Sequence, residues 1–266
     1  TQVGVLEIGM NHPGEIASLT RIANPDLVAI TSVASAHTGF FRTLRGVALA
    51  KSEILTASRS GIPAFLPADS PFLPLLTRQS AGKKVWTFGK SKSALLKLMI
   101  VQAGLKNITF SVHMESSRSD VFRCPNFGEH QLTNILLAIG IAGQFCVPYK
   151  KIRAVVAKLR LPPGRGELIR IGPHVLIDDS YNANPASMSA SFRRVYELQR
   201  LMAGRGGRGR PRLVLVLGDM LELGAKTKAD HKNIGILARA LNPWRILFVG
   251  EQGVSVRTGF ISEGGL

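Results

Sequence analysis

The sequence predicts an α/β protein with a mostly parallel sheet whose faces are covered by helices. Short apolar runs with the length of buried strands alternate along the chain with segments of helical periodicity. This alternation is typical of parallel sheets, because two parallel strands need a long crossover connection, which a helix supplies. With 266 residues, the chain is long enough for one large or two modest domains.

Composition and charge indicate a globular chain with a basic surface. Apolar residues make up 45% of the chain and charged residues 19%, and no apolar run reaches about 18 residues, so we expect no membrane span. Lys and Arg number 34 against 17 acidic residues, and the formal net charge of +17 favours partners that carry phosphate or other acidic groups. Two cysteines, Cys124 and Cys146, are too few for a disulfide framework, which fits a protein of a reducing compartment. We expect both side chains to be buried in the protein as small apolar residues.

The first fifty residues are expected to contain two strands and two helices. Residues 3–8 read as a buried strand, and residues 27–30 as a second one. Residues 13–16 begin a helix with proline in its first turn and an acid near its positive end. Apolar positions recur at helical spacing from Thr43, which predicts an amphipathic helix that carries Lys51. Because the chain opens at Thr1 without an initiator Met or a secretory signal, we expect a processed chain or a fragment.

The middle of the chain changes its pattern. After a short strand at residues 62–66, Ser70-Pro71 predicts a capped helix start with proline in its first turn. Between residues 85 and 124, strand-like runs follow one another without helices, which favours a small antiparallel insertion. Helical periodicity returns at residues 129–144 and again at 148–159.

Residues 162–166, Pro-Pro-Gly-Arg-Gly, break the chain, and we place a domain boundary just beyond them. The predicted domains are residues 1–172 and 173–266. The second has a strand at 175–177, a helix ending near 201, a strand at 213–217, a helix at 229–241 and a strand at 246–249. This βαβαβ order is typical of a Rossmann-like domain, and we expect it to be incomplete.

Three chemically distinct side chains stand near the ends of the first elements. Glu7 ends the first strand, His37 follows the second, and Lys51 lies on the helix after it. Side chains just beyond the carboxyl ends of strands line the ligand crevice of an open α/β sheet. Carboxylate and imidazole suit a divalent ion, although Glu7 alone could cap a helix and Lys51 alone could be a solvated charge. The combination carries the hypothesis of an ion and phosphate site.

Polar turns follow two strands of the second domain. Residues 178–185, Asp-Asp-Ser-Tyr-Asn-Ala-Asn-Pro, could accept hydrogen bonds from ribose hydroxyls or bind an ion, or could form an ordinary Asx turn. Residues 218–224, Gly-Asp-Met-Leu-Glu-Leu-Gly, leave the same alternatives open.

Two glycine motifs are excluded as phosphate loops. Residues 204–209 match G-x-G-x-x-G, but they precede a strand instead of joining a strand to a helix. Gly89-Lys90-Ser91 ends like a phosphate loop, yet Lys84 stands where that pattern needs glycine, so no complete Walker A sequence occurs. The basic residues 205–212 are either a solvated turn or an RNA-phosphate contact.

Seven segments occur in the order found in the Mur ligases, and the chain resembles that family. They are residues 6–16, His37, residues 50–54, Gly128-Glu129-His130 with Asn134, Pro163-Gly164-Arg165, residues 179–185 and residues 217–224. The segments at 179–185 and 217–224 resemble the branch of the family that attaches D-alanyl-D-alanine to a UDP-muramoyl-tripeptide. The two domains would then be the central ATP-binding domain and the C-terminal domain of that family.

The resemblance implies an ATP-dependent, cytoplasmic ligase of peptidoglycan synthesis that works through an acyl phosphate. By resemblance, Glu7 and His37 are Mg²⁺ ligands, and Lys51 becomes carbamylated and helps to hold the metal. The remaining roles fall to the nucleotide site: His130, Asn134 and Asn182 as nucleotide contacts, Arg165 as a phosphate contact and Asp179 as the ribose acceptor.

Departures from the family pattern leave two other functions open. The glycine-rich phosphate loop and the UDP-sugar domain that precede the Glu7 segment in the family do not occur in this sequence, so we expect no turnover by this chain alone. One alternative is a non-catalytic basic module that binds RNA or an acidic partner in a large assembly, in an organellar matrix. The other is ligation of the folylpolyglutamate synthetase type. Retention of Glu7, His37, Lys51 and Asp179 favours the ligase.

Overall fold

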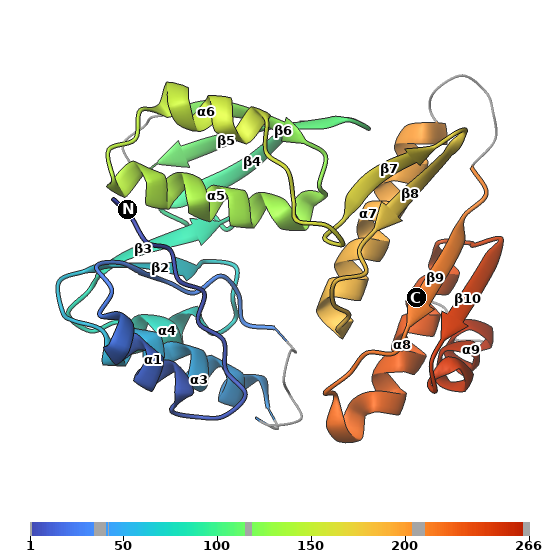
Figure 1. Ribbon diagram of the computed structural model, residues 1–266, viewed down its shortest axis with the longest axis horizontal. Coiled ribbons are helices and arrows are strands. Elements are labelled where there is room, and N and C mark those ends of the chain that lie inside the picture. The colour runs from blue at the N-terminus through green and yellow to red at the C-terminus, as the bar shows by residue number, and fades with distance from the viewer. Residues whose placement is uncertain (1, 35–40, 42, 115–118, 204–210, 263–266) are drawn as a thin grey trace. The chain divides into compact units, whose positions relative to one another are not determined.

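A computed structural model describes residues 2–34, 41, 43–114, 119–203 and 211–262 (Figure 1). The chain forms two compact units, and each is described by itself. Unit 1 consists of Thr1–Val101, Thr109–Arg123 and Leu132–Ala157, and unit 2 of Gln102–Ile108, Cys124–Gln131 and Lys158–Leu266. The predicted α/β fold class, with a mostly parallel sheet, is confirmed. Among the described helices, none combines the length and the apolar character that a bilayer crossing needs.

A six-stranded sheet with the order β1-β2-β3-β4-β5-β6 organises the first part of the chain. Its strands are β1 (Val28–Ala29), β2 (Pro63–Pro67), β3 (Lys84–Gly89), β4 (Leu96–Ala103), β5 (Asn107–Met114) and β6 (Ser119–Pro125). Strands β1 to β4 pair in parallel. The three-residue connection between β4 and β5 makes those neighbours antiparallel, because a parallel pair needs a longer crossover.

The prediction of a separate antiparallel insertion at residues 85–124 is wrong. β4 pairs in parallel with β3 at Phe88 and Leu96 and at Gly89 and Lys97, so these strands extend the main sheet. The sequence pattern showed short strands without helices, which is the pattern of a hairpin. The pattern did not show that β3 and β4 continue the parallel sheet.

Helices cover both faces of this sheet. They are α1 (Glu15–Ala23), α3 (Leu44–Ala57), α4 (Leu73–Gln79), α5 (Glu129–Gln144) and α6 (Tyr149–Ala157). Leu66 of β2 packs with Leu55 of α3 and Leu76 of α4 in one buried cluster. Phe65 faces the other way, since successive strand residues point to opposite faces, and its ring lies against Gly140 of α5. The Thr43 hydroxyl caps α3 by accepting the Gly46 N–H at 3.0 Å.

Two local predictions in unit 1 are wrong. Residues 3–8 do not form a strand, and Val5 and Leu6 are 90% and 70% exposed, because no described strand pairs with this segment. An extended segment without a partner satisfies none of its backbone groups in a ladder. Ser70-Pro71 does not open a helix: Ser70 Oγ accepts the Phe72 N–H at 3.2 Å in a turn, and α4 begins at Leu73.

Unit 2 contains a hairpin and a small parallel sheet. β7 (Glu167–Ile171) pairs antiparallel with β8 (His174–Asp178), and β9 (Val214–Gly218) pairs in parallel with β10 (Arg245–Val249). Its helices are α7 (Pro185–Ala203), the 3₁₀ turn η1 (Gly224–Lys226), α8 (Thr227–Ala240) and α9 (Gly253–Ile261). Gly172, the last residue of our first predicted domain, lies between the two paired strands of the hairpin, and the exact boundary stays a prediction.

The core of unit 2 is built from α7, α8 and the β9–β10 pair. Phe192 and Val195 of α7 are buried with Leu215 of β9 and Ile234 of α8. Helices α8 and α9 pack closely at glycines. A Cβ atom at Gly235 would collide with the backbone of α9, so only glycine permits this approach.

Candidate functional site

The candidate site residues lie in both units. Glu7, Lys51 and Asn134 belong to unit 1, and His130, Arg165, Asp179 and Asn182 belong to unit 2. His37 falls within residues 35–40, outside the described residues. The two groups are therefore built up separately.

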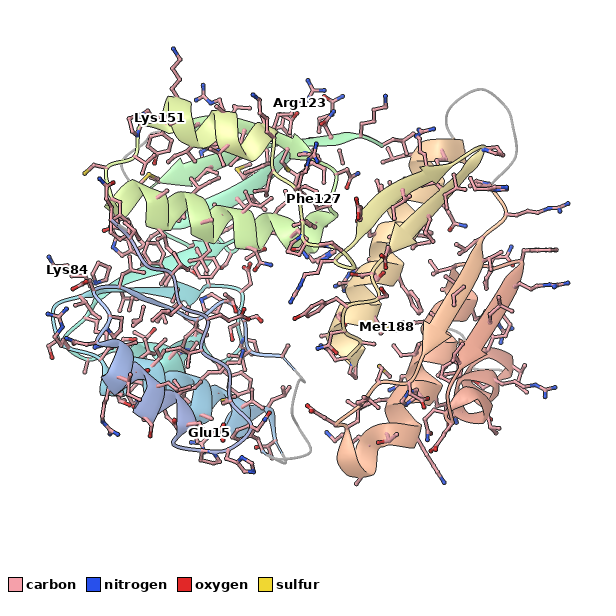
Figure 2. The ribbon with its side chains drawn as sticks, viewed as in Figure 1. Glu15, Lys84, Arg123, Phe127, Lys151 and Met188 are labelled. Atoms are coloured by element: carbon pink, nitrogen blue, oxygen red, sulfur yellow. The ribbon has the colours of Figure 1, made fainter. Side chains whose placement is uncertain are left out.

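Glu15 shapes the chain that leads from Glu7 into α1. Its carboxylate accepts the backbone N–H of Asn11 at 2.7 Å and that of His12 at 3.0 Å. These hydrogen bonds, first that from Asn11, lower the pKa of the Glu15 carboxyl group. Figure 2 labels Glu15 at the start of α1. The acid in the first turn therefore closes the turn that precedes its own helix.

Glu53 of α3 is also a structural acid. Its two carboxylate oxygens accept the N–H of Gly14 at 2.7 Å and that of Ala17 at 3.1 Å, so it satisfies donors at the N-terminus of α1. Glu7 differs, since it is exposed and lies in a segment without regular structure. Of the three acids in this region, Glu7 is the one that helix capping does not use.

Lys51 lies on α3 and is half-buried. Its Nζ donates a hydrogen bond to the Ser32 carbonyl oxygen at 2.9 Å, and burial lowers the pKa of its ammonium group. Met10, three residues after Glu7, packs with Val47 and Ala50, and Ala50 directly precedes Lys51. This apolar cluster joins the segment after Glu7 to the turn of α3 that carries the lysine.

The metal set predicted from the sequence consists of Glu7, His37 and Lys51. Among the residues that the structure describes, no group of three or more His, Cys, Asp or Glu side chains could hold a metal ion. Because His37 is outside that part of the chain, the set stays a prediction.

In unit 2, the chain between β6 and α5 forms a bonded turn. Asn126 Nδ2 donates to the Gly104 carbonyl at 2.6 Å, and Asn126 Oδ1 accepts the Gly128 N–H at 3.0 Å. Gly128 has φ 88°, a left-handed conformation that favours glycine. The turn leads directly into the first turn of α5, which carries His130. Asn134 follows four residues later, on the same face of the helix.

A second turn carries Arg165. Gly164 and Gly166 have φ 73° and 81°, and the Gly166 N–H donates to the Asp178 carbonyl at 2.7 Å. The Tyr181 N–H donates to the Gly164 carbonyl at 3.0 Å, and the Arg165 guanidinium stacks 3.9 Å from the centroid of the Tyr181 ring. The Pro-Gly-Arg segment is thus bound to the segment after β8.

The segment after β8 separates structural residues from available ones. Asp178 Oδ1 accepts the Ser180 N–H at 3.2 Å and the Ser180 hydroxyl at 2.7 Å, which is an Asx turn. Asn184 Oδ1 accepts the Ser187 N–H at 2.9 Å at the start of α7. Asp179 is half-buried and Asn182 is exposed, so these two can meet a ligand.

The Gly-Asp-Met-Leu-Glu-Leu-Gly loop after β9 is fixed from both sides. Asp219 accepts the N–H groups of Glu251 at 2.8 Å and Gln252 at 3.0 Å. Fully buried His231 of α8 accepts the Met220 N–H at Nε2, 2.9 Å, and its Nδ1 donates to the Thr227 carbonyl at 2.7 Å. This arrangement requires a neutral ring with the proton on Nδ1.

Two family models match this chain. The model of the Mur ligase middle domain matches residues 1–142, and that of the Mur ligase, glutamate ligase domain, matches residues 164–255. The chain belongs to the Mur ligase family.

Individual Mur ligases are similar along nearly the whole chain. The UDP-N-acetylmuramoyl-tripeptide--D-alanyl-D-alanine ligase of Escherichia coli is 33% identical over 96% of this chain and 54% of its own length. The Bacillus subtilis enzyme of the same name is 29% identical over 100% of this chain and 54% of its own length. The chain therefore spans about half the length of the curated relatives that it matches.

Solved Mur ligase structures share the fold. A MurF crystal structure from Acinetobacter baumannii has a TM-score of 0.83 and 27% identity, covering 96% of this chain and 53% of that one. Thermotoga maritima MurF, solved in complex with ADP, has a TM-score of 0.76 and 21% identity, covering 96% of this chain and 65% of that one.

Arg194 of α7 is a residue of this Mur ligase chain that the sequence did not single out. It is 3% exposed, and its guanidinium donates to the carbonyl oxygens of Asn126 and Gly166, both at 2.6 Å. An arginine in mid-helix beside a second arginine reads as a solvated charge. The available signal was its position in the apolar stripe of α7, between Phe192 and Leu198.

Of the two glycine motifs excluded from the sequence of this Mur ligase chain, Gly89-Lys90-Ser91 does not form a phosphate loop. The N–H groups of Lys90 and Ser91 donate to Asp69 Oδ2 at 2.8 Å and Oδ1 at 2.7 Å, so an internal carboxylate already uses these amides. The second motif, residues 204–209, lies outside the described residues. The Gly89-Lys90-Ser91 turn is therefore structural.

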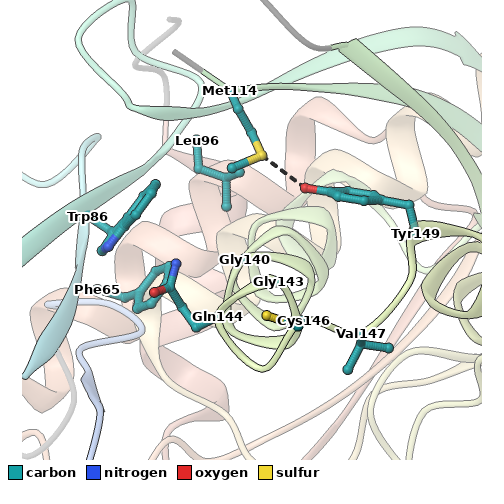
Figure 3. A pocket seen from close by; sticks show the side chains of 10 residues that line it. All are labelled: Phe65, Trp86, Leu96, Met114, Gly140, Gly143, Gln144, Cys146, Val147 and Tyr149. Carbon is teal, nitrogen blue, oxygen red and sulfur yellow. Dashed lines mark hydrogen bonds between the residues drawn. The ribbon is translucent and has the colours of Figure 1, made fainter. Parts of the chain in front are cut away.

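A cavity of about 330 Å³ lies in unit 1, apart from the predicted site residues (Figure 3). Trp86 and Phe65 stack at one wall with ring centroids 6.1 Å apart, and the Tyr149 hydroxyl donates to Met114 Sδ at 2.9 Å. Cys146, predicted to be buried, is exposed and lines this cavity, because it lies in the turn after α5 with φ 54°.

The prediction for the other cysteine is confirmed. Cys124 in β6 is buried, and burial raises the pKa of its thiol to about 11.

Proposed function

We propose that this chain belongs to an ATP-dependent ligase that joins D-alanyl-D-alanine to a UDP-muramoyl-tripeptide through an acyl phosphate. The observation that carries the proposal is the environment of Lys51. A half-buried lysine with a lowered pKa, bonded to a main-chain carbonyl, lies on the helix that packs against the segment after Glu7. The names of the Escherichia coli and Bacillus subtilis relatives support this substrate pair.

Burial prepares Lys51 for reaction with carbon dioxide. A neutral lysine amine attacks carbon dioxide, a C–N bond forms, and the nitrogen loses a proton to solvent, which leaves a carbamate anion. Because burial lowers the pKa of Lys51, a larger fraction of the amine is neutral at a given pH. The carbamate then offers oxygen atoms, the ligands that Mg²⁺ prefers.

The donor set fits a magnesium ion. A Glu7 carboxylate, a Lys51 carbamate and the His37 imidazole would hold it, and the exposed Glu7 is not engaged in helix capping. When bound, magnesium neutralises phosphate charge. The chain's own contribution is to convert a cation into an anion at the place where a cation must bind.

We assign the nucleotide to the candidate residues of unit 2 and to Asn134, which follows His130 by one turn of α5. Asp179 accepts ribose hydroxyls, Arg165 contacts phosphate, and His130, Asn134 and Asn182 complete the contacts. ADP in the Thermotoga maritima MurF structure makes it the first ligand to test. No complete Walker A sequence occurs among the 266 residues, so we propose that they do not complete the reaction alone. A cytoplasmic location goes with this function as a prediction.

Adjacent aspartates give a matched test of the nucleotide site. We expect ADP binding, measured by titration calorimetry on the full chain, to weaken about tenfold in Asp179→Asn, since a charged acceptor is lost. Asp178→Asn should stay within about twofold, because the Asp178 carboxylate accepts hydrogen bonds from Ser180 within its own turn. Equal effects of the two substitutions, or no binding by the unaltered chain, would contradict the nucleotide assignment.

The reaction itself is tested by product formation. The chain is joined to the preceding segment of a full-length relative, and ADP release is followed. We expect release only when magnesium, the UDP-muramoyl-tripeptide and D-alanyl-D-alanine are all present. Release that ignores D-alanyl-D-alanine would refute the proposed amine substrate.

A second candidate function is the binding of RNA by a basic, non-catalytic surface in a large assembly. Trp244 is 56% exposed, and the guanidinium groups of Arg212 and Arg245 lie 5.5 and 4.8 Å from its ring centroid. Exposed aromatic rings beside arginines suit single-stranded RNA. Neutralising Arg205, Arg208, Arg210 and Arg212 should weaken RNA binding and reduce its salt dependence in a filter-binding assay. Unchanged binding would exclude this function.

A further inference from the structure

Arg194 is a buried cation that donates hydrogen bonds to two backbone carbonyls. Its Nη1 donates to the Gly166 carbonyl and its Nη2 to the Asn126 carbonyl, both at 2.6 Å. Burying a guanidinium is costly unless its donors are satisfied. Within the described residues, its Nε is buried without a hydrogen-bond partner, which adds to the cost of burying this side chain.

The two carbonyls belong to segments that are far apart in the sequence. Asn126 is in the turn that leads into α5, and Gly166 ends the turn that carries Arg165. Gly166 is also bonded through its N–H to the Asp178 carbonyl at 2.7 Å. A single side chain of α7 therefore ties together the backbone that precedes His130 and the backbone beside Asp179.

Two glycines make room for this arrangement. A Cβ atom at Gly128 would lie 2.7 Å from Arg194 Cδ and 3.0 Å from His130 Cε1. A Cβ atom at Gly166 would lie 2.5 Å from Arg194 Nη1 and 3.9 Å from Asp179 Oδ1. Both distances to Arg194 are shorter than real Cβ contacts. The arginine side chain is thus in close contact with the surroundings of both His130 and Asp179.

The charges of the cluster agree with its geometry. Burial lowers the pKa of His130; Asp179 opposes this effect, and Arg194 and Arg193 add to it. Burial also lowers the pKa of Arg194, which Asp179 and then Glu197 oppose. These directions are the ones expected of an imidazole, a carboxylate and a guanidinium that lie as close together as the Cβ distances at Gly128 and Gly166 indicate.

We propose that Arg194 is a positioning residue of the nucleotide site, which fixes the start of α5 and the Arg165 turn on α7 so that His130 and Asp179 face the same ligand. The inference rests on the proposed nucleotide function. Arg194 itself is buried and does not touch the nucleotide; it acts through the two carbonyls. Arginine suits this role because its planar fork can bind two acceptors at fixed directions, which a lysine ammonium cannot do.

The neighbouring residue provides a matched control. Arg193 carries the same charge on the same helix but is exposed. We compare Arg194→Met and Arg194→Lys with Arg193→Met in the full chain, and check folding of each by near-ultraviolet circular dichroism. The dissociation constant of ADP should rise at least tenfold in Arg194→Met, by a smaller factor in Arg194→Lys, and less than twofold in Arg193→Met. If Arg194→Met does not fold, Arg194→Lys serves as the test variant.

A second readout separates positioning from general stability. The pKa of His130, measured by NMR titration, should rise more in Arg194→Met than in Arg193→Met, because a nearer positive charge is removed. ADP binding by folded Arg194 variants equal to that of Arg193→Met would overturn the proposal. If the unaltered chain binds no ADP, the nucleotide function fails. In that case the NMR titration alone tests whether Arg194 holds His130 in place. Equal changes of the His130 pKa in the two variants would overturn this arrangement, and a larger change in Arg194→Met would support it.

Discussion

Lys51 and Arg194 are two cations that the fold withdraws from water and bonds to backbone carbonyls, one in each unit. Lys51 makes one such bond, to Ser32, and remains half-buried. Arg194 makes two, to Asn126 and Gly166, and is 3% exposed. Burial lowers the pKa of both groups. The environments are similar, but the chemistry that they permit differs.

The difference follows from the two side chains. An ammonium group can lose its proton and become a nucleophile, so burial raises the neutral, nucleophilic fraction of the Lys51 amine. A guanidinium stays protonated in proteins, so burial of Arg194 yields a rigid five-donor fork and no nucleophile. In the roles that we propose, the same withdrawal from water prepares one cation for chemistry and uses the other to position the backbone.

The largest expected effect comes from removing the reactive member of this pair. Lys51→Arg keeps the charge but cannot form the carbamate, so ligase activity in the joined enzyme should fall roughly a thousandfold, the equivalent of several kcal/mol of metal-assisted stabilisation. Lys51→Ala should lose as much and recover in part when acetate or formate is added. Activity is measured as ADP release.

Lys83 is the matched control for this substitution. It also donates to carbonyls, those of Ser58 at 3.1 Å and Arg59 at 2.8 Å, and burial also lowers its pKa. Lys83→Arg should leave activity within about twofold. Comparable losses in Lys51→Arg and Lys83→Arg would show that burial, and not carbamate chemistry, explains the effect.

The next largest expected effect is on stability and comes from removing Arg194, the second buried cation of the comparison. Arg194→Met leaves two buried carbonyls without donors, so the free energy of unfolding should fall by roughly 2–4 kcal/mol. Arg193→Met should change it by less than about 0.5 kcal/mol, since Arg193 is exposed. Urea denaturation gives both values. A neutral result for Arg194→Met would mean that the carbonyl bonds do not hold the three segments together.

His231 sharpens the comparison, because it is buried without a charge. In His231→Gln the side-chain oxygen can replace Nε2 as acceptor of the Met220 N–H, whereas in His231→Asn it is too short and only the bond to Thr227 can be kept. We expect a loss of roughly 1–3 kcal/mol for His231→Asn and a smaller one for His231→Gln. The order is checked by thermal unfolding, and the reverse order would show that the Thr227 bond matters more.

The smallest expected effect is the pH-dependent stability contributed by Asp219, an anion that, like the two cations, is bonded to backbone groups. Hydrogen bonds, first that from the Glu251 N–H, lower the pKa of Asp219 below its ordinary value of about 4. The folded state therefore binds this proton less tightly than the unfolded state does. The resulting stability is present above about pH 4 and is lost as pH falls through the lowered pKa.

Melting temperatures between pH 7 and pH 3 test this assignment. The difference between the unaltered chain and Asp219→Asn should be greatest near pH 7 and shrink below about pH 4. Asp26→Asn is the control, since Asp26 is exposed and its ion pair with Arg59 lies at the surface. A difference that stays constant with pH would show that the Asp219 charge does not contribute.

Most elements of the fold could be predicted from local patterns. The predicted helix at residues 129–144 matches α5, and strands β2 and β8 lie within about a residue of their predicted positions. The wrong predictions concern which segments pair with one another in a sheet. Residues 3–8 have the composition of a strand but no described neighbour to pair with, and β4 was assigned to an insertion although it continues the parallel sheet.

At the candidate site, too, local motifs gave the residue types but not the bonding partners of each side chain. Motif order named the family and the candidates Glu7, Lys51, His130, Arg165 and Asp179. The resemblance named Asp179 and not Asp178, but gave no physical reason for the choice. In the structure the Asp178 side chain bonds within its own turn, whereas Asp179 lies near Arg194 and interacts electrostatically with His130. The Gly89-Lys90-Ser91 motif was excluded as a phosphate loop because its spacing lacks the first glycine. The structure adds a physical reason, since the Lys90 and Ser91 amides already donate to the Asp69 carboxylate.

The sequence by itself determined the fold class, the family and the chemical types at the candidate site, because periodicity and short motifs are local properties of the chain. Only the tertiary structure decided what each polar group bonds to. Glu15 and Glu53 hold backbone amides, Lys51 is desolvated beside Ser32, and Arg194 is buried between two carbonyls. Desolvation and hydrogen-bond partners come from residues distant in sequence, and they determine whether a charge is solvated, structural or reactive.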